Sequence, residues 1–570
     1  MHTLDWIVML GTLLSIVAYG VYRTRNINSV QSYLLGDRDL PWWTIGLSIM
    51  ATQASAITFL STPGQAYQDG MRFAQFYFGL PVAMVFLAVF VLPLYYRLNV
   101  YTAYEYLEGR FDLRTRTLTA ILFLVQRGLA AGITIYAPAI ILSTILGWSL
   151  SITILFIGII VIFYTVSGGT KAVSVTQKQQ MIIILSGMFL AAIILILQLP
   201  PDISFGDAVG IAGKLGKLKV VDFEFDLDNR YNFWSGMLGG TFLFLSYFGT
   251  DQSQVQRYLS GKSLTESRLG LLFNGILKVP MQFLVLFVGI LVFIFFLFNQ
   301  APIHFNESNV AKLQGQNYEQ YTELETQHTK LFEDRKDEVF RLLDAINTDD
   351  EQAISQSQGR IAEMMQENKA IRLKADELIL QANPDAKVED TDYVFITFVT
   401  RYLPIGMVGL LLAVIFSAAM SSTSSELNAL ATTTVIDLYR RSMVKNRDDK
   451  HYLSASKWFT ILWGAMALFF AATASLFDNL IQAVNIIGSL FYGVILGIFL
   501  VAFFLKKVGG RAVFYGAIIA EFIVATVFIL DNLEVIHIAY LWLNLIGCVL
   551  CMIFALILQF MLPPKVQVSA

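Results

Sequence analysis

The chain has 570 residues, of which 56% are hydrophobic and only 15% are charged. This composition excludes a soluble globular protein. Apolar runs of about 20 residues recur along the chain and predict a polytopic, all-α membrane protein. The formal net charge of −3 is unevenly distributed, because residues 301–390 hold 19 acidic and 10 basic residues and the remainder holds 24 and 30. An acidic block therefore interrupts a mildly basic membrane body.

The apolar runs predict about thirteen membrane spans. No basic segment precedes the first run, which predicts a retained helix with its N-terminus outside rather than a signal peptide. The spans are predicted at residues 4–22, 42–62, 72–98, 116–146, 150–168, 173–198, 233–258, 270–300, 392–440, 454–476, 479–506, 511–531 and 535–562.

Basic residues gather on alternate connections between these spans, as the positive-inside rule requires of cytoplasmic segments. The alternation predicts a multi-pass protein of the cell (inner) membrane, with the C-terminus in the cytoplasm and residues 301–390 outside. Two of the basic connections carry Arg97, Arg110, Arg114 and Arg116, and Arg440, Arg441, Lys445, Arg447 and Lys450.

The acidic block is rich in Glu, Gln, Lys and Ala, which suits two solvated helices near 315–346 and 351–382. We expect an extracytoplasmic helical hairpin, whose turn at 347–350 (NTDD) supplies cap residues for the second helix. A solvated structural insertion and a lid or partner-binding element both remain open. The chain then divides into spans 1–8 in residues 1–300, the insertion at 301–390, and spans 9–13 in residues 391–570.

Hydroxyl groups crowd the ninth span in SAAMSSTSSELNALATTTVIDLY, from Ser417 to Tyr439, next to the carboxylate of Glu426. Polar groups inside a bilayer mark either a functional site or a helix–helix interface held by hydrogen bonds. Hydroxyl and carbonyl oxygens suit an alkali cation. Both interpretations remain open from this stretch alone, and the role of Glu426 is not assigned.

Two spans are interrupted by polar and small residues at membrane depth. The second contains MATQASAITFLSTPG (50–64), and the seventh contains GMLGGTFLFLSYFGTDQSQVQRYL (236–259). They lie five spans apart, which indicates an inverted repeat of five plus five helices with a solute site near the midplane. The first repeat is predicted at 42–198, and the second begins at 233.

Arg127 and Lys278 are cations within predicted spans. A charge at this depth costs a few kcal/mol, so each should face a cavity or a partner. For Arg127, contact with a solute and a structural ion pair are both open; for Lys278 the alternative is snorkelling toward the inner surface. Cys548 and Cys551 lie in the last apolar run, where packing is the expected role.

Three segments of the chain carry a resemblance to a known family: YTVSGGTKAV (164–173), FGTDQSQVQRYLSGK (248–262) and MSSTSSELNALATTTVIDLY (420–439). They resemble the sodium/solute symporter family, which includes sodium-coupled glucose, proline, iodide, multivitamin and sialic acid transporters. The resemblance covers nearly the whole chain outside 301–390, and STPGQAY and YRLNVYTAYEYLEGRF are most similar to the branch of iodide, multivitamin, monocarboxylate and sialic acid carriers. It implies the inverted-repeat fold of amino-acid/sodium symporters.

The resemblance also implies site residues. Carbonyls of Ala51, Ala54 and Ala418, with the hydroxyls of Ser421 and Ser422, would bind sodium. Tyr247 resembles the aromatic residue that closes the inner side of the sugar pocket in glucose carriers. The solute would contact Gln53, Ser55, Thr58, Phe73, Tyr77, Arg127, Lys278 and Asn485.

One position departs from the family. Many members carry an aspartate in a WTD motif that is tied to a second sodium site, and this chain has Gln177 there, followed by Lys178. Loss of the carboxylate removes the neutraliser of a second cation. We therefore expect one sodium ion per cycle.

Together these features predict a sodium-coupled symporter that imports a small organic solute by alternating access. A sugar acid, sialic acid, monocarboxylate or sugar fits the polar residues. A transporter-like sensor that acts with a partner protein is the alternative, and residues 301–390 would offer the partner an extracytoplasmic surface. No nucleophile–base pattern indicates an enzyme, and no nucleic-acid partner is expected.

Overall fold

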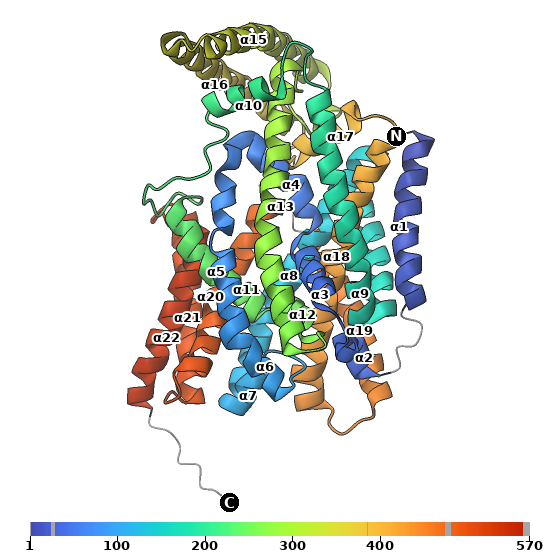
Figure 1. The fold of residues 1–570 in the computed structure, drawn as a ribbon, viewed down its shortest axis with the longest axis vertical. Coiled ribbons are helices and arrows are strands. Elements are labelled where there is room, and N and C mark those ends of the chain that lie inside the picture. Colours follow the sequence, from blue (N-terminus) through green and yellow to red (C-terminus); the bar gives the residue numbers. More distant parts are fainter. Residues whose placement is uncertain (1, 24–28, 385, 473–479, 563–570) are drawn as a thin grey trace, which may run out of the picture.

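The computed structural model describes residues 2–23, 29–384, 386–472 and 480–562, and these fold into an elongated helical bundle (Figure 1). The first part of the chain forms α1 (Thr3–Arg23), α2 (Val30–Leu35), η1 (Gly36–Arg38), α3 (Trp42–Gln53), α4 (Ala56–Asp69), η2 (Gly70–Tyr77), α5 (Leu80–Phe86), η3 (Leu87–Val91), α6 (Leu92–Leu98), α7 (Glu105–Arg110), α8 (Leu113–Leu146) and α9 (Leu150–Leu197).

The rest of the chain continues the bundle and adds a hairpin at one end. It forms α10 (Phe205–Lys214), η4 (Ser235–Gly239), α11 (Gly240–Gly249), α12 (Gln252–Leu259), α13 (Leu264–Phe298), α14 (Glu307–Val310), α15 (Gly315–Asn347), α16 (Glu351–Ala382), η5 (Thr391–Tyr393), α17 (Val394–Tyr402), α18 (Met407–Thr433), η6 (Thr434–Met443), α19 (Asp449–Ala471), α20 (Leu480–Phe504), α21 (Gly510–Asn532) and α22 (Tyr540–Met561).

The apolar helices confirm a multi-pass membrane protein. Within the described residues, 10 helices are long and apolar enough to cross a membrane by length and composition. A shorter apolar helix, Leu150–Val166, precedes a kink in α9 at Gly169, whose φ is 53°. The described helices overlap all thirteen predicted runs. The end of the run predicted at 454–476 lies outside the described residues.

Both predicted interruptions are present. The second span breaks between α3 and α4 at Ala54 and Ser55, and the seventh breaks between α11 and α12 at Thr250 and Asp251. Each break exposes backbone groups in the middle of the bundle, which an unbroken helix would have satisfied internally. The chain therefore has irregular backbone at two places in its interior.

A third break was not predicted. Residues 392–440 were expected to form one span, which is wrong, because α17 ends at Tyr402 and α18 begins at Met407. Pro404 lacks an amide N–H and disfavours helical backbone at the residue before it. Gly406 then adopts a φ of 88°, which residues with a side chain rarely reach.

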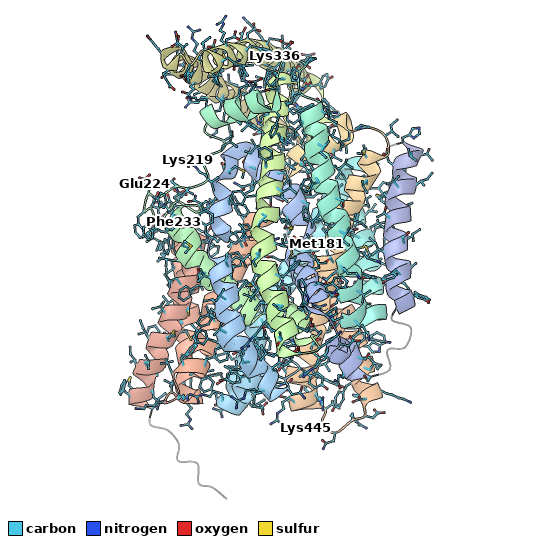
Figure 2. All side chains as sticks on the ribbon, in the orientation of Figure 1. Met181, Lys219, Glu224, Phe233, Lys336 and Lys445 are labelled. Atoms are coloured by element: carbon cyan, nitrogen blue, oxygen red, sulfur yellow. The ribbon has the colours of Figure 1, made fainter. Side chains whose placement is uncertain are left out.

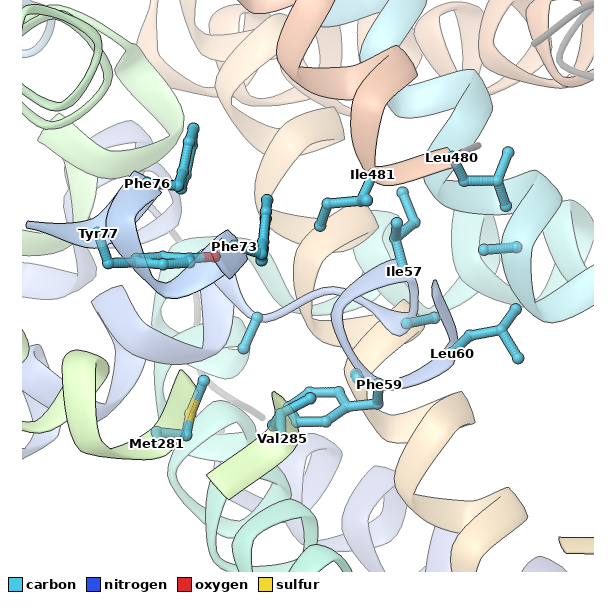
Figure 3. Packing of buried hydrophobic residues seen from close by; sticks show 14 of the residues in the cluster. Ile57, Phe59, Leu60, Phe73, Phe76, Tyr77, Met281, Val285, Leu480 and Ile481 are labelled. Atoms are coloured by element: carbon cyan, nitrogen blue, oxygen red, sulfur yellow. The ribbon is translucent and has the colours of Figure 1, made fainter. Parts of the chain in front are cut away.

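α18 lies at the centre of the bundle. In the most apolar 18-residue stretch of α18 and η6, 89% of the residues are buried. The same fraction is 22% for α1 and α19, which therefore lie at the periphery. Around α4, buried apolar side chains of η2, α13 and α20 pack closely (Figure 3). α18 and α4 are thus held on several sides by packed helices.

The hairpin consists of α15 and α16, and these helices confirm the two predicted in the acidic block. Asp350 caps α16 by accepting hydrogen bonds from the amides of Gln352 and Ala353. At the base of the hairpin, Asp390 accepts from the Phe305 amide at 2.5 Å and from Arg372 at 2.6 Å. The hairpin is therefore fastened to the bundle by buried polar contacts.

The two ends of the bundle differ in what they carry. The hairpin and the first turn of α1 lie at one end, and α7 and the last turn of α22 lie at the other (Figure 1). Lys336 of the hairpin and Lys445, from a basic connection, are labelled at opposite ends in Figure 2. This arrangement agrees with the relative positions that the alternation of basic connections predicts.

Candidate functional site

The residues of the predicted sodium site come together where α18 passes the end of α3. Ser421 donates a hydrogen bond from its Oγ to the carbonyl of Ala51 at 2.9 Å. Ser422 donates to the carbonyl of Ala418, one turn earlier on its own helix, at 3.0 Å. Ala54 is the residue at which α3 ends. All five residues are at most 1% exposed.

This cluster suits a small cation in its donor chemistry. The last carbonyls of a helix have no partner within that helix, and the C-terminal end of a helix carries partial negative charge. Ala51 and Ala54 lie at such an end inside the bundle. The Ser421 hydroxyl shows that α18 approaches near enough to complete a set of neutral oxygens. The residues present therefore fit a sodium ion.

Gln177 of α9 lies directly beside this cluster and reaches to Ser425, one turn further along α18. Its amide nitrogen donates to the Thr52 hydroxyl at 3.0 Å, the Ser421 carbonyl at 3.1 Å and the Ser425 hydroxyl at 2.7 Å. Its amide oxygen accepts from Ser48 at 2.5 Å. An uncharged N–H donor thus occupies the middle of three oxygen atoms that could otherwise face a cation.

Lys178, the next residue, points elsewhere. Its Nζ lies 4.5 Å from the centroid of the Trp43 ring, and Trp43 is 40% exposed. The ammonium group does not face the hydroxyl cluster, so it is not a source of repulsion there. Of these two residues, Gln177 is the one that contacts the hydroxyl cluster.

A cavity of about 80 Å³ opens beside the break between α3 and α4. Six of the eight predicted solute-contacting residues line it, together with the predicted gate residue. Tyr247 packs under Arg127, with 5.3 Å between the guanidinium carbon and the ring centroid. The predicted residues in the lining are Gln53, Ser55, Thr58, Tyr77, Arg127, Asn485 and Tyr247.

The structure does not bring Phe73 and Lys278 into the lining of the cavity. Phe73 stacks on Phe76 at 5.4 Å and packs among buried apolar residues (Figure 3). The Lys278 side chain is fully buried on α13, with its Nζ 5.9 Å from the Tyr77 ring centroid. Its Nζ has no hydrogen-bond partner within the described residues. Lys278 therefore does not snorkel, and Tyr77 lies between it and the cavity.

Arg127 is the centre of a buried charge network. It forms ion pairs with Asp251 and, at 3.1 Å, with Glu426. Tyr492 donates to Asp251 at 2.9 Å. Asp251 also caps α12 by accepting from the Ser253 amide at 2.9 Å. One cation therefore joins a helix break, α8 and α18.

The network gives Glu426 its place and contains two residues that the sequence analysis did not single out. One Glu426 oxygen pairs with Arg127, and the other has no hydrogen-bond partner within the described residues. Asp251 could have been recognised as a carboxylate inside an interrupted span. Tyr492 carries no such signal, because a tyrosine in an apolar run resembles packing.

The comparisons with known proteins agree with this geometry. The Sodium:solute symporter family model matches residues 33–324 and 359–561. The chain belongs to this family. A family of sodium-coupled transporters supports a membrane carrier with sodium as its coupling ion and a small-molecule substrate.

Relatives and a solved structure add detail. Sodium-coupled monocarboxylate transporter 2 of Mus musculus is 27% identical over 499 residues, which are 87% of this chain and 67% of the relative. The sodium/iodide cotransporter of Homo sapiens is 34% identical over 270 residues, 47% of this chain and 41% of the relative. A sodium-coupled sialic acid symporter in a substrate-bound outward-open state is 21% identical, with a TM-score of 0.75 and full coverage of both chains. It confirms the fold.

The Arg127 network generates a test of stability. Arg127→Gln leaves Asp251 and Glu426 buried without their cation, so we expect a loss of about 3–5 kcal/mol in the free energy of unfolding. Removing one acid as well, in Arg127→Gln with Glu426→Gln, should recover part of it. Thermal unfolding of the purified protein measures both effects.

The matched control is Arg401→Gln, which removes an ion pair with Glu307 whose side chains are 43% and 54% exposed. An exposed pair contributes at most about 1 kcal/mol. Equal losses in the Arg127 and Arg401 variants would contradict a buried network.

Proposed function

We propose that the protein is a sodium-coupled symporter that imports a small organic solute by alternating access, with one sodium ion per cycle. The ion would be held by the carbonyls of Ala51, Ala54 and Ala418 and by the hydroxyls of Ser421 and Ser422. The contact that supports this most directly is the hydrogen bond from Ser421 to Ala51, which joins α18 to the broken span beside the cavity.

The same break serves the ion and the solute. Ala51 and Ala54 would provide carbonyls at this break, and Gln53 and Ser55, which are adjacent to them in the chain, line the cavity. An ion that orders this backbone also orders the residues that the solute contacts. Each ligand then raises the affinity of the other by the same factor. An inward sodium gradient would drive uptake of the solute as one part of the bundle moves against the other.

Gln177 supports a single ion. Its amide nitrogen donates to the same cluster of oxygens that would surround a second cation near Ser421 and Ser425. A second sodium would displace three hydrogen bonds and gain no carboxylate in return. The cost of leaving buried donors unpaired, about 1–3 kcal/mol for each group, opposes such binding.

The charges at the cavity favour a neutral, hydroxylated solute such as a sugar or polyol. Arg127 pairs with both Asp251 and Glu426, so it offers an incoming anion no uncompensated positive charge. Among the described residues, one side-chain oxygen of Gln53 and one of Glu426 have no hydrogen-bond partner, and both residues line the cavity as acceptors. Hydroxyl groups would donate to them, whereas a carboxylate or halide would be repelled by Glu426.

For orientation, we propose that the hairpin and the N-terminus are extracytoplasmic and that the end with α7 and Lys445 faces the cytoplasm. The basic residues of the alternate connections support this orientation. The hairpin would be an extracytoplasmic insertion whose base contacts α4, since Gln68 donates to Thr391 at 2.5 Å.

Sodium coupling is tested with purified protein in liposomes. Uptake should require an inward sodium gradient and should stop when potassium replaces sodium. Ser421→Ala with Ser422→Ala removes two neutral ligands, so we expect the sodium concentration for half-maximal uptake to rise about 100-fold. Ser424→Ala is the matched control, because this buried hydroxyl on the same helix is bonded to the Ser421 carbonyl. An unchanged sodium requirement in the double variant would remove the proposed site.

The stoichiometry is tested by the charge carried per solute molecule. With a neutral solute we expect one positive charge, measured from the potential at which uptake reverses. Gln177→Asp replaces the amide donor with a carboxylate among the same oxygens, and the ratio should rise toward two. A ratio of two in the unaltered protein contradicts the role assigned to Gln177.

The solute class is tested by thermal unfolding with candidate compounds in sodium and in potassium. A coupled solute at 100 times its dissociation constant stabilises the protein by about 2.7 kcal/mol, and we expect this only in sodium. The set should include neutral sugars and polyols, sugar acids, sialic acid, monocarboxylates and iodide. Stabilisation by an anion alone would overturn the neutral-solute assignment and leave sodium coupling intact.

A further inference from the structure

A second cavity, of about 500 Å³, lies at the end of the bundle opposite the hairpin. It is formed where the segment before α7, the start of α8, the end of η6 and the start of α19 meet. Figure 2 shows Lys445 at this end. The lining residues are Tyr101, Glu105, Arg116, Ile436, Arg440, Arg441, Lys445, Asn446, Arg447 and Tyr452.

The lining is strongly basic. It holds five cations and one carboxylate, that of Glu105. Two of the cations are compensated, because Arg116 pairs with Asp437 and Glu108, and Arg441 pairs with Glu108. The Glu105 carboxylate accepts from the amides of Tyr101 and Thr102. The same carboxylate also acts electrostatically on Arg116, which is already one of the two compensated cations.

Three cations of the lining have no carboxylate within ion-pair distance among the described residues: Arg440, Lys445 and Arg447. All three side chains are exposed. Arg440 lies over the Tyr452 ring, with 5.2 Å between the guanidinium carbon and the centroid. Uncompensated cations around one concave surface make a site for an anion with several oxygen atoms.

The loop that carries two of these cations is held in place. Tyr452 donates from its hydroxyl to the Val444 carbonyl at 2.9 Å and accepts from the Arg447 amide at 3.3 Å. Asn446 between them adopts a φ of 59°, a conformation that Asn tolerates better than most residues. The buried tyrosine thus fastens both ends of the turn, and Lys445 and Arg447 are presented by a fixed backbone.

We propose that this pocket binds the anionic phosphate headgroup of a phospholipid in the adjacent membrane leaflet. Its surroundings favour a lipid over a soluble anion. α19 is a peripheral span, and its Trp458 is 68% exposed. Met443, two residues from Lys445, is 76% exposed. The acyl chains of a lipid would lie along the apolar surface, and its anionic headgroup would enter the basic pocket at the end of the span.

The positive-inside rule alone does not account for this cluster. Lys506 and Lys507 are also exposed basic residues at the end of a span, and they are not among the residues of the cavity. Their position satisfies the rule without a pocket. Arg440, Lys445 and Arg447 differ because they converge on one concave surface.

A bound headgroup would act on the central helix. η6 continues α18 without a break, and the buried Asp437 of η6 accepts from Arg116 at 2.8 Å and from Thr102 at 2.9 Å. Gln252 of α12 in turn donates to the Tyr101 carbonyl at 2.8 Å. The lipid would therefore hold α18, α8 and the second broken span together at this end.

The test uses the full-length protein in neutral detergent, titrated with dioleoylphosphatidylglycerol or dioleoylphosphatidylcholine, with bound lipid counted by native mass spectrometry. We expect one phosphatidylglycerol to remain bound at concentrations at which phosphatidylcholine does not. The triple variant Arg440→Gln, Lys445→Gln, Arg447→Gln should bind it about 100-fold more weakly, if each cation contributes as basic residues near anionic lipid usually do.

The matched control, Lys506→Gln with Lys507→Gln, should bind within about twofold of the unaltered protein, since these residues are outside the pocket. An equal loss in this control would show non-specific attraction and overturn the proposal. Glycerol phosphate and inorganic phosphate form the remaining arm. If either saturates the pocket at the same concentration as the lipid, the site is one for soluble phosphate and the lipid assignment fails.

The triple variant should also keep the thermal unfolding midpoint of the unaltered protein in phosphatidylcholine, because its three side chains are exposed. Where it does not fold, the single variant Lys445→Glu replaces it, and we expect a loss of at least tenfold in affinity. Full phosphatidylglycerol affinity in that variant overturns the proposal. None of these outcomes depends on which solute is transported.

Discussion

Backbone polar groups inside a membrane must find partners within the protein, and this constraint shapes the centre of the bundle. Two spans break there, and at each break a side chain forms a hydrogen bond with a backbone group that the helix leaves free. At the end of α3, the Ala51 carbonyl accepts from Ser421. At the start of α12, the Ser253 amide donates to Asp251. The Ser421 hydroxyl and the Asp251 carboxylate therefore satisfy backbone groups at the helix breaks, and the proposed ion and solute sites would use the same breaks.

The buried charges follow from the second break. Asp251 caps α12 in the interior, where a lone carboxylate would be too costly, and Arg127 of α8 compensates it. Glu426 then places a second acid on the same guanidinium from α18. An arginine that two acids share is a poor receptor for a further anion. The polar groups that the cavity offers are therefore hydrogen-bond acceptors. Arg127 considered alone would suggest a site for an anion, but its two ion pairs oppose that interpretation.

Hydropathy and turn chemistry predicted the spans, the hairpin helices and both functional breaks, because each leaves a local pattern of apolar length, glycine or hydroxyl residues. The direction in which a buried residue faces leaves no such pattern in helices that are apolar on every side. Phe73 and Lys278 were therefore placed at the solute site, although Phe73 stacks on Phe76 and Lys278 lies against the Tyr77 ring. Tyr492 was missed for the converse reason, since its contact with Asp251 joins residues 241 positions apart. Pro404 and Gly406 are a recognisable signal for the third break, but the apolar residues on both sides of them resemble one continuous span.

α18 connects the separate parts of the molecule physically. Ser421 meets the broken second span, Glu426 meets Arg127, and Asp437, beyond the end of α18 in η6, meets Arg116 beside the basic pocket. A helix that is buried along most of its length moves as a unit, because close packing leaves it few intermediate positions. An ion at one level and an anionic headgroup at another would bias the same element. Coupling between them requires no further device, only that the two ligands prefer the same position of α18.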